Sequence, residues 1–347
     1  LLEKLEKNKE IKKILVTSNT LSSSKILKTL NLKKIIHQFF PIDTNYHTKK
    51  FLDYWNPSSV FFVDSEIWPN MYLNIKKRNI PIILLNGRIT KKSFNKWKIF
   101  SQFSKKIFKN FNLCLSSSRL SKTYLKKLGA KNIKFCGNLK FSQSENEKIV
   151  INKNLRKFLN SRKIWCASST HNTEEKFCAL VHKELKKKYK NLLTIIIPRH
   201  IERTQSINNE MNKLNLKTYT YASNQKINEK TDIYIVDAYG KTKTFYKFSK
   251  NVFLGGSLIN HGGQNPLEAA RYGCNILHGP KIENFTEIYE YLQKNKISQK
   301  IKNQKQMINF LDKLFSKNTN SKKIQGKLNF IGKKILNNTY KEIKIFL

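Results

Sequence analysis

Short apolar runs alternate along this chain with longer segments whose apolar residues recur at helical spacing. We expect a buried strand at each run: residues 14–16, 60–63, 82–85, 113–115 and 133–136 in the first half, and residues 164–167, 193–197, 233–236, 252–254 and 276–277 in the second. Strands that alternate with helices in this way indicate an α/β fold with parallel sheets.

The pattern divides into two similar halves, which predicts two doubly wound, Rossmann-like domains. We expect a first domain over residues 1–141, a polar linker over 142–150 and a second domain over 151–320. Residues 321–347 indicate a basic helical tail, which we expect to pack back toward the N-terminal domain. A length of 347 residues suits two domains. Ligands of such sheets bind beyond the carboxyl ends of the strands, so we expect a site in a cleft between the domains.

The stretch from residue 251 to residue 280 carries the densest set of site candidates. Its apolar run ends at Gly255-Gly256-Ser257, where a ligand can approach the backbone closely. Asn265 then suits the N-cap of a helix and Pro266 its first position, which places Asn265 and Glu268 on one face of the first turn. Free N–H groups at a helix start favour phosphate, and a carboxylate beside them suits ribose hydroxyls. The pattern fits either a nucleotide site or a purely structural turn.

Other polar groups in the second half also follow expected strands. The segment Ser168-Ser169-Thr170-His171 is expected to open a long helix over residues 173–188, where its hydroxyls cap the helix or bind phosphate. Arg199 follows Pro198 at the end of a strand and can form a bidentate pair with a phosphate or a carboxylate. A flexible loop is expected at residues 237–241.

Three features of the first half admit two interpretations each. Asp64 and Glu66 end a strand beside Trp68, either as acid, base or cation-stabilising groups or as caps beside a packed ring. Lys140 either faces a leaving phosphate or is one of many surface lysines. The helical stretch 91–109 combines aromatic residues with lysines, which suits the core or an anionic membrane surface.

The charge of the chain is extreme, with 67 Lys and Arg against 23 Asp and Glu and a net charge of +44. Such a field favours phosphates, anionic lipid or nucleic acid, although a general bias toward Lys, Asn and Ile explains part of it. The five cysteines form no C-x-x-C pair, which indicates reduced thiols rather than a zinc site. There is no P-loop, no nucleophile elbow, no H-E-x-x-H motif, no Asp-x-Asp cluster, no signal peptide and no apolar run of membrane-spanning length.

Six segments, taken in order, resemble motifs of one family, the bacterial 3-deoxy-D-manno-octulosonic acid (Kdo) transferases of lipopolysaccharide assembly. Their sequences are DSEIWPN, NGR, GNLKF, ASSTHNTEE, IIIPRH and LGGSLINHGGQNPLEAA. The resemblance covers nearly the whole chain and implies a two-domain GT-B fold. It also implies inverting transfer of Kdo from CMP-Kdo to a lipid A precursor (lipid IVA), with neither metal nor cofactor. The partners would be CMP-Kdo, the lipid acceptor and the anionic surface of the bacterial inner membrane on its cytoplasmic face, with no specific nucleic acid.

The resemblance also implies roles for single residues. Glu66 and Lys140 would stabilise the transition state, in which the donor carbon gains positive charge and the phosphate departs. CMP would be held by Pro198, Arg199, Tyr239, Gly240, Lys241, Asn265, Pro266, Leu267 and Glu268. Further donor contacts would come from Ser169, Thr170, Gly256 and Ser257.

Some features depart from the family pattern. In the family, the general base is a Glu that lies upstream of the position where this chain starts at Leu1. A hydrophobic anchor of the family also lies upstream of that position. We therefore expect this chain to be N-terminally truncated, to bind the donor and to catalyse poorly. Gln264 stands where His is usual, and Lys241 where an acidic residue is usual. Three alternatives stay open: another GT-B transferase with a UDP-sugar donor, a non-catalytic basic protein that binds nucleic acid, or a degenerate, non-catalytic homologue.

Overall fold

The computed structural model describes residues 1–143, 151–223, 227–317 and 320–347, which form two compact units. The first unit comprises residues 1–143 with 331–347, and the second comprises residues 144–330. Residues 144–150 of the linker expected at 142–150 lie outside the described residues. The boundary near residue 330 falls inside the last long helix, α15 (Ser321–Ile343), which therefore contributes to both units.

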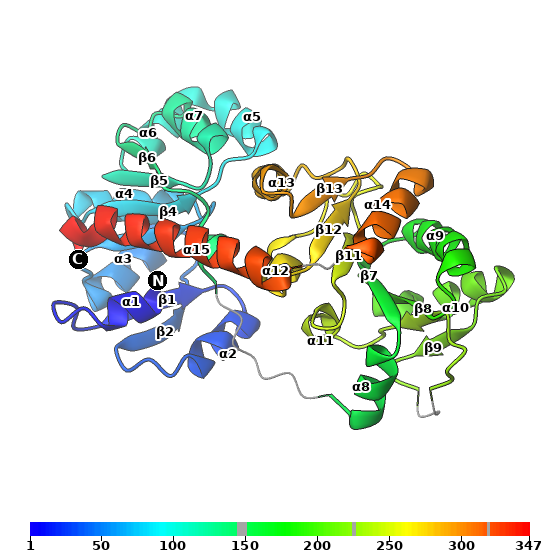
Figure 1. Ribbon diagram of the computed structural model, residues 1–347. Coiled ribbons are helices and arrows are strands. Elements are labelled where there is room, and N and C mark those ends of the chain that lie inside the picture. The colour runs from blue at the N-terminus through cyan, green and yellow to red at the C-terminus, as the bar shows by residue number, and fades with distance from the viewer. Residues whose placement is uncertain (144–150, 224–226, 318–319) are drawn as a thin grey trace. The chain divides into compact units, whose positions relative to one another are not determined.

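The first unit alternates strands and helices (Figure 1). Its strands are β1 (Ile14–Ser18), β2 (Ile35–Phe39), β3 (Val60–Val63), β4 (Ile82–Gly87), β5 (Leu113–Ser116) and β6 (Ile133–Phe135). Its helices are α1 (Leu2–Glu6), α2 (Leu21–Thr29), α3 (Asn45–Trp55), α4 (Pro69–Lys77), α5 (Lys91–Ile99), α6 (Ser101–Phe108), α7 (Arg119–Lys127), the 3-10 turns η1 (Leu139–Ser142) and η3 (Lys344–Phe346), and the end of α15.

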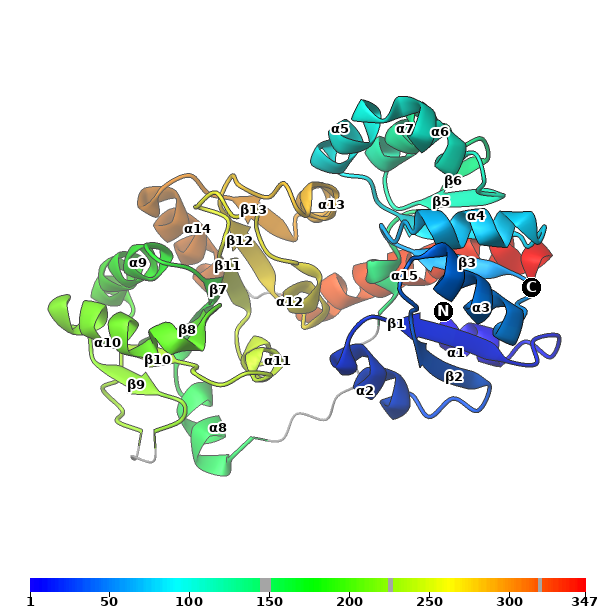
Figure 2. The same ribbon diagram turned by 180° about the vertical axis from the view of Figure 1, so that it is seen from behind.

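These strands form two parallel sheets, whereas the sequence predicts one wound sheet. One sheet pairs β1 with β2, and the other has the order β3-β4-β5-β6 (Figure 2). A shared core nevertheless joins them, because Leu5 and Ile14 pack with Ile83 and Leu85 of β4. Ile343 near the end of α15 belongs to the same core.

The second unit contains one seven-stranded parallel sheet with the order β13-β12-β11-β7-β8-β10-β9. Its strands are β7 (Lys163–Thr170), β8 (Leu192–Pro198), β9 (Thr218–Thr220), β10 (Ile233–Ile235), β11 (Asn251–Leu254), β12 (Asn275–His278) and β13 (Ser298–Lys300). Its helices are α8 (Lys153–Asn160), α9 (Glu174–Lys188), η2 (Ile201–Arg203), α10 (Thr204–Lys213), α11 (Thr242–Tyr246), α12 (Leu267–Arg271), α13 (Thr286–Lys294), α14 (Gln304–Ser316) and the start of α15.

Apolar side chains of the central strands and of α9, α10 and α14 form the main core of this unit. Trp165 and Phe253 come from strands, while Val181, Met211 and Leu311 come from the three helices. The central strands β7, β8 and β11 are buried along almost their whole length. Near-continuous apolar runs are what a parallel sheet covered on both faces requires, and this confirms the predicted fold class.

Four of the five cysteines are buried: Cys114 in the first unit and Cys166, Cys178 and Cys274 in the second. None is in a disulfide. Burial raises the pKa of each of these four thiols above its ordinary value, so the thiolate is disfavoured. They are packing residues, as the scattered spacing predicts.

In the part of the chain that the structure describes, no helix combines the length and the apolar character needed to cross a bilayer. The same residues contain no group of three or more His, Cys, Asp or Glu side chains placed to hold a metal ion.

Candidate functional site

Most of the predicted ligand-binding residues of the second unit follow four neighbouring strands of its sheet. Ser169 and Thr170 end β7, and Pro198 ends β8. Arg199 follows β8, Tyr239 to Lys241 follow β10, and Gly255 to Ser257 follow β11. Since β11, β7, β8 and β10 are consecutive and parallel, their carboxyl ends meet at one edge of the sheet. That edge is the usual ligand-binding edge of a wound sheet.

A buried carboxylate organises this edge. Glu174 at the start of α9 is 1% exposed. Its Oε2 accepts hydrogen bonds from the N–H groups of His171 (3.0 Å) and Gly256 (2.7 Å). Its Oε1 accepts from Ser257 (3.2 Å) and Leu258 (3.0 Å). Burial raises the pKa of Glu174, and the four N–H groups oppose that shift because they stabilise the ionised form. The side chain therefore ties the loop after β11 to the loop after β7.

The glycines of this loop allow that close approach. A Cβ on Gly255 would lie 2.5 Å from the carbonyl oxygen of Ser169 and 2.7 Å from Glu174 Oε2. Gly256 has φ +64°, a left-handed conformation, and a Cβ there would lie 3.0 Å from His261. Both positions therefore require glycine, because the loop lies against the end of a neighbouring strand.

Three histidines from three loops gather at this edge, and two of them, His171 and His261, lie beside Gly256. The ring of His171 lies 4.4 Å from that of His261 and 5.8 Å from that of His200, between centroids. Burial, and then the nearby His261, His200, Arg199 and Arg203, lower the pKa of His171 to about 4. Its Nε2 is buried and has no hydrogen-bond partner among the described residues. A neutral imidazole with an unused nitrogen suits a polar ligand at this edge.

The two arginines of the loop after β8 differ in their environment. Arg203 forms a bidentate pair with Glu175, whose side chain is fully buried, with 2.8 Å from Nη1 to Oε1 and 3.2 Å from Nη2 to Oε2. Arg199 is exposed, and no hydrogen bond or ion pair of its side chain is found within the described residues. Its backbone N–H donates to the Thr170 carbonyl at 2.9 Å, which fixes the loop beside β7. Arg203 is thus structural, while Arg199 is open to a ligand.

The loop after β10 is exposed at its tip. Tyr239 donates a hydrogen bond from its hydroxyl to Glu202 Oε1 at 3.1 Å. Gly240 has φ +75°, and a Cβ added there would contact nothing within 4 Å. Lys241 Nζ lies 5.8 Å from the centre of the Tyr221 ring. The loop thus has room for a ligand at its tip.

The turn after the second glycine pair differs slightly from the expectation. Helix α12 begins at Leu267, so Pro266 is its N-cap rather than its first residue. Asn265 Oδ1 accepts a hydrogen bond from the Leu267 N–H at 3.1 Å. Asn265 therefore caps the helix as expected, although it lies one residue before the N-cap position. Glu268 lies in the first turn, as predicted.

Two expectations at this edge need correction. The segment from Ser168 to Thr170 does not open a helix but ends strand β7, and α9 starts only at Glu174. The reason is that Ser168 and Thr170 pair with Ile197 and Pro198 of β8, with a shift in register between them. Ser257 is fully buried, and its hydroxyl donates to the Leu254 carbonyl and accepts from the Gly279 N–H, so it positions the loop. Thr170 is also fully buried, although its hydroxyl has no partner among the described residues.

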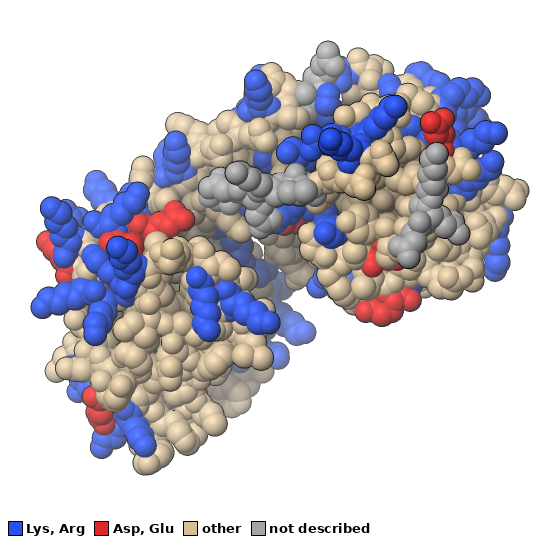
Figure 3. Space-filling model, turned by 90° about the horizontal axis from the view of Figure 1, so that it is seen from below, with Lys and Arg blue, Asp and Glu red and all other residues tan. Residues whose placement is uncertain are grey.

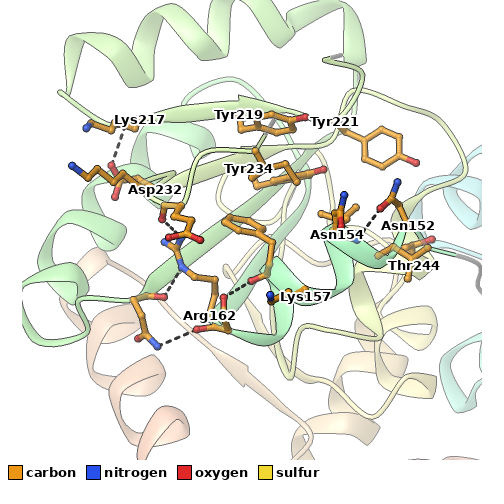
Figure 4. Close-up of a pocket in the computed structure, with 18 of the residues that line it drawn as sticks. Asn152, Asn154, Lys157, Arg162, Lys217, Tyr219, Tyr221, Asp232, Tyr234 and Thr244 are labelled. Atoms are coloured by element: carbon orange, nitrogen blue, oxygen red, sulfur yellow. Dashed lines mark hydrogen bonds between the residues drawn. The ribbon is translucent and has the colours of Figure 1, made fainter. Parts of the chain in front are cut away.

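A large cavity lies elsewhere in the second unit (Figure 4). It has a volume of about 1360 Å³ and extends under β9 and β10 beside α8. Tyr219, Tyr221 and Tyr234 line it, together with Arg162, which donates to the carbonyls of Asn191, Leu192, Glu229 and Thr231. Of the residues proposed for the site, Lys241 lines it. The cavity and the carboxyl edge are therefore largely different places.

In the first unit, Lys140 and Asp64 form an ion pair at 3.3 Å between Nζ and Oδ2. Asp64, with φ +59°, also accepts a hydrogen bond from the Asn86 amide, whose oxygen accepts from the Leu139 N–H at 2.8 Å. Glu66 is exposed, and its Oε2 accepts from Trp68 Nε1 at 2.7 Å. The ends of β3 and β4 and the turn η1 therefore bring Asp64, Asn86 and Lys140 together and leave Glu66 at the surface.

Comparison with known proteins decides the family. A family model described as 3-deoxy-D-manno-octulosonic-acid transferase matches residues 1–143. The 3-deoxy-D-manno-octulosonic acid transferase of Rickettsia typhi is 34% identical over 345 residues, which cover 96% of this chain and 73% of that protein. The chain belongs to the Kdo transferase family.

Members of the family occur outside the rickettsiae. The transferase of Haemophilus influenzae is 28% identical over 80% of this chain and 66% of that protein. Among solved structures, a UDP-N-acetylglucosamine 2-epimerase has a TM-score of 0.65 at 12% identity and covers 99% of this chain and 91% of that one. That likeness concerns the fold alone, and it agrees with the GT-B architecture expected of a Kdo transferase.

Sequence reasoning missed two parts of this family member's site. Glu174 falls in the first turn of the helix expected over residues 173–188, where acidic residues are common at the surface, so its sequence position does not indicate burial. The three histidines lie in loops far apart along the chain, and no spacing connects them. Only the placement of the strands brings these groups together.

Proposed function

We propose that this member of the family transfers Kdo from CMP-Kdo to a lipid A precursor such as lipid IVA, with inversion and without a metal ion or another cofactor. The reaction takes place, in this proposal, at the cytoplasmic face of the bacterial inner membrane. The observation that carries the proposal is the carboxyl edge of the second unit's sheet, where Glu174 holds a glycine loop beside Arg199 and three histidines.

The chemistry of this edge suits a nucleotide that carries a carboxylated sugar. Arg199 is free to pair with a phosphate or a carboxylate, and Arg is well shaped for both. Asn265 and Glu268 offer hydrogen-bond acceptors for ribose hydroxyls at the start of α12. Pro198, Tyr239, Gly240, Lys241, Pro266 and Leu267 complete the proposed CMP contacts.

In the first unit, we assign Glu66 and Lys140 to the reacting centre. Glu66 is an exposed carboxylate that would favour positive charge on the donor carbon. Lys140, held by Asp64, would offset the negative charge of the departing phosphate. In a chain extended at its N-terminus to carry the general base of the family, replacing either by Gln is expected to lower the transfer rate by about a hundredfold, the typical effect of one electrostatic group, with no change in CMP affinity. Equal rates for the variants and the parent chain would remove the residue from the mechanism.

The donor site is tested by calorimetric titration with CMP, UMP and UDP. We expect CMP to bind selectively, and Arg199→Ala and Glu268→Gln each to weaken binding by about 1–3 kcal/mol. Arg156→Ala is the matched control, because Arg156 is an exposed arginine of α8 outside the proposed site. Equal binding of CMP and UDP would instead favour a UDP-sugar donor. Absence of CMP binding by the folded chain would overturn the donor assignment.

A further inference from the structure

Three tyrosines, Tyr219, Tyr221 and Tyr234, form an aromatic floor in the cavity beside α8 (Figure 4). Tyr219 of β9 and Tyr234 of β10 are register partners, so their side chains lie on the same face of the sheet. Their rings stack with centroids 5.3 Å apart. Ile233 and Ile235, on either side of Tyr234, belong to the core with α9 and α10 on the opposite face. The floor is therefore separate from that core.

The floor also offers a hydroxyl group. Tyr234 is 1% exposed, and no hydrogen bond of its hydroxyl is found within the described residues. Burial raises the pKa of Tyr234, so the hydroxyl keeps its proton near neutral pH and stays a donor. Buried tyrosine hydroxyls usually have a partner, and this one lines the cavity. A ligand in the cavity would supply that partner.

Arg162 fixes the loops that border the cavity at the amino edge of the sheet. Its guanidinium donates to the carbonyls of Asn191 at 2.9 Å, of Glu229 at 2.6 Å and of Thr231 at 2.7 Å. These carbonyls belong to the segments just before β8 and β10. With its donors used in this way, Arg162 holds the border in place and does not serve a ligand.

Three lysines, Lys190, Lys217 and Lys230, lie in these border loops and line the cavity. We call them the lysine rim. Lys190 and Lys230 are direct neighbours of the carbonyl groups that Arg162 holds. The Lys217 N–H donates to Asp232 Oδ2 at 3.0 Å. The three side chains are exposed, and none has a hydrogen bond or ion pair within the described residues. The backbone of each lysine is thus fixed, while its ammonium group is available to a ligand.

The carboxylates of the lining do not neutralise the lysine rim. Asp232 pairs with Lys186, with 2.7 Å between Nζ and Oδ1, and its other oxygen accepts the Lys217 N–H. Glu229 is the second carboxylate of the lining, and it is exposed. The lysines that line the cavity are those at positions 157, 186, 190, 217, 230 and 241. This excess of positive charge favours an anionic ligand.

Positive charge alone does not single out the cavity, because Figure 3 shows Lys and Arg side chains spread over the face that it presents. The difference is that an aromatic floor lies beside lysines from three separate, fixed loops. Aromatic rings stack on nucleobases, and ammonium groups pair with phosphates. The volume of about 1360 Å³ exceeds the range of about 300–1,000 Å³ that is usual for small-molecule sites, so a nucleotide with several phosphates has room.

We propose that this cavity binds a nucleoside diphosphate or triphosphate, with the base against Tyr219, the Tyr234 hydroxyl as a further donor and the phosphates on the lysine rim. The rim precedes β8, β9 and β10, so it lies at the opposite edge of the sheet from the proposed donor site. Lys241, which belongs to both linings, is left out of the assignment. This binding goes beyond the proposed transfer reaction and does not depend on it.

Calorimetric titration with ATP, in buffer without divalent metal and with saturating CMP, tests the proposal on the whole chain. CMP is added to keep ATP away from the carboxyl edge. We expect one equivalent of ATP to bind. Adenosine and inorganic triphosphate are each expected to bind much more weakly, because each lacks half of the contacts. Failure of ATP to bind at low salt would overturn the proposal, and triphosphate bound as tightly as ATP would refute a site for a nucleotide.

The lysine rim is tested by single substitutions on the surface. Lys190→Gln and Lys230→Gln are each expected to weaken ATP binding about fivefold at low salt, and less as salt screens the charge. Lys294→Gln is the matched control, because Lys294 is an exposed lysine of α13 outside the cavity. Equal losses in Lys190→Gln and Lys294→Gln would mean general attraction to a basic protein and would refute the site.

The aromatic floor is tested at Tyr219, which is half-buried. Tyr219→Leu is expected to weaken ATP binding roughly tenfold, because base stacking is lost, while Tyr219→Phe keeps the ring and should bind like the parent chain. Photolabelling of the parent chain with 8-azido-ATP locates the base without any substitution. We expect the label on a peptide that contains Tyr219 or Tyr234. Label confined to residues 198–203 or 255–268 would place the base at the carboxyl edge and overturn the proposal.

The two sites of the second unit can be separated. Arg199→Ala is expected to weaken CMP binding and to leave ATP binding unchanged, and Lys190→Gln is expected to do the reverse. Failure of CMP to bind, with ATP bound as described, would overturn the donor site and leave this one standing. Loss of both ligands in either variant would mean a single shared site and would refute the proposal. Binding of oligouridylate RNA to the lysine rim without any binding of ATP would make the cavity an RNA site instead.

Discussion

Glu174 offers the sharpest test of how the candidate site is built. Its two carboxylate oxygens accept four backbone N–H groups, two at each oxygen. Glu174→Gln keeps the shape of the side chain but replaces one oxygen by an NH₂ group, which only donates. Two of the four N–H groups would then face a donor instead of an acceptor.

The cost follows from that count. A buried donor left without an acceptor costs about 1–3 kcal/mol, so two of them predict a loss of about 2–6 kcal/mol in the free energy of unfolding. The affected N–H groups belong to His171 and Gly256 or to Ser257 and Leu258, and thus to the proposed donor site itself. The variant should therefore also bind CMP more weakly.

Urea unfolding followed by circular dichroism measures the loss. The control is Glu184→Gln on the same helix, where Glu184 is exposed and pairs with Lys187 at 2.8 Å. That pair is expected to contribute less than about 1 kcal/mol. If Glu174→Gln were as stable as Glu184→Gln and bound CMP like the parent chain, the carboxylate would not be what holds the glycine loop.

Three further predictions concern buried charge, pH and backbone conformation. Arg203→Ala should lower the free energy of unfolding by about 3–5 kcal/mol in urea titrations, because it leaves the buried Glu175 carboxylate unpaired. The control Lys187→Ala, which breaks an exposed ion pair, should lower it by less than about 1 kcal/mol. His278 is fully buried, and burial lowers its pKa from 6.5 to about 4, so the unfolded chain binds a proton in that range that the folded chain does not. Stability should thus be full above pH 6.5 and fall by about 3 kcal/mol toward pH 4, and His278→Gln should flatten that part of the pH profile. Gly256→Ala should cost about 1–3 kcal/mol by thermal unfolding, owing to its left-handed backbone and the contact with His261.

The sequence predicts the central strands of both units well, because buried parallel strands are continuous apolar runs. It does not predict β2, β9 or β13. β9 and β13 are three-residue strands at the two edges of their sheet, and β2 pairs with β1 alone. Short edge strands have one neighbour and little burial, so their residues carry a weak apolar pattern. The helical stretch expected at 91–109 is two helices, α5 and α6, and the break between them at Phe100 has no Gly or Pro to mark it.

The site divides in a similar way. Polar residues after consecutive strands are predictable, since parallel topology brings strand ends to one edge. The identity of their ligand stays a prediction. Burial of Glu174 and Glu175 is not predictable, because an acidic first turn looks the same whether it faces solvent or a glycine loop. The sequence predicts a helix start where β7 ends, because hydroxyl residues suit both a helix cap and a strand.

The buried cysteines give each unit its own reporter of unfolding. Cys114 lies in the core of the first unit, and Cys166, Cys178 and Cys274 are buried in the second. A buried thiol with a raised pKa reacts with an alkylating reagent only when its surroundings open. Pulsed alkylation in increasing urea, followed by peptide mapping, would therefore time the opening of the two units separately within one intact chain. Simultaneous labelling of all four thiols would mean that the units unfold as one cooperative body.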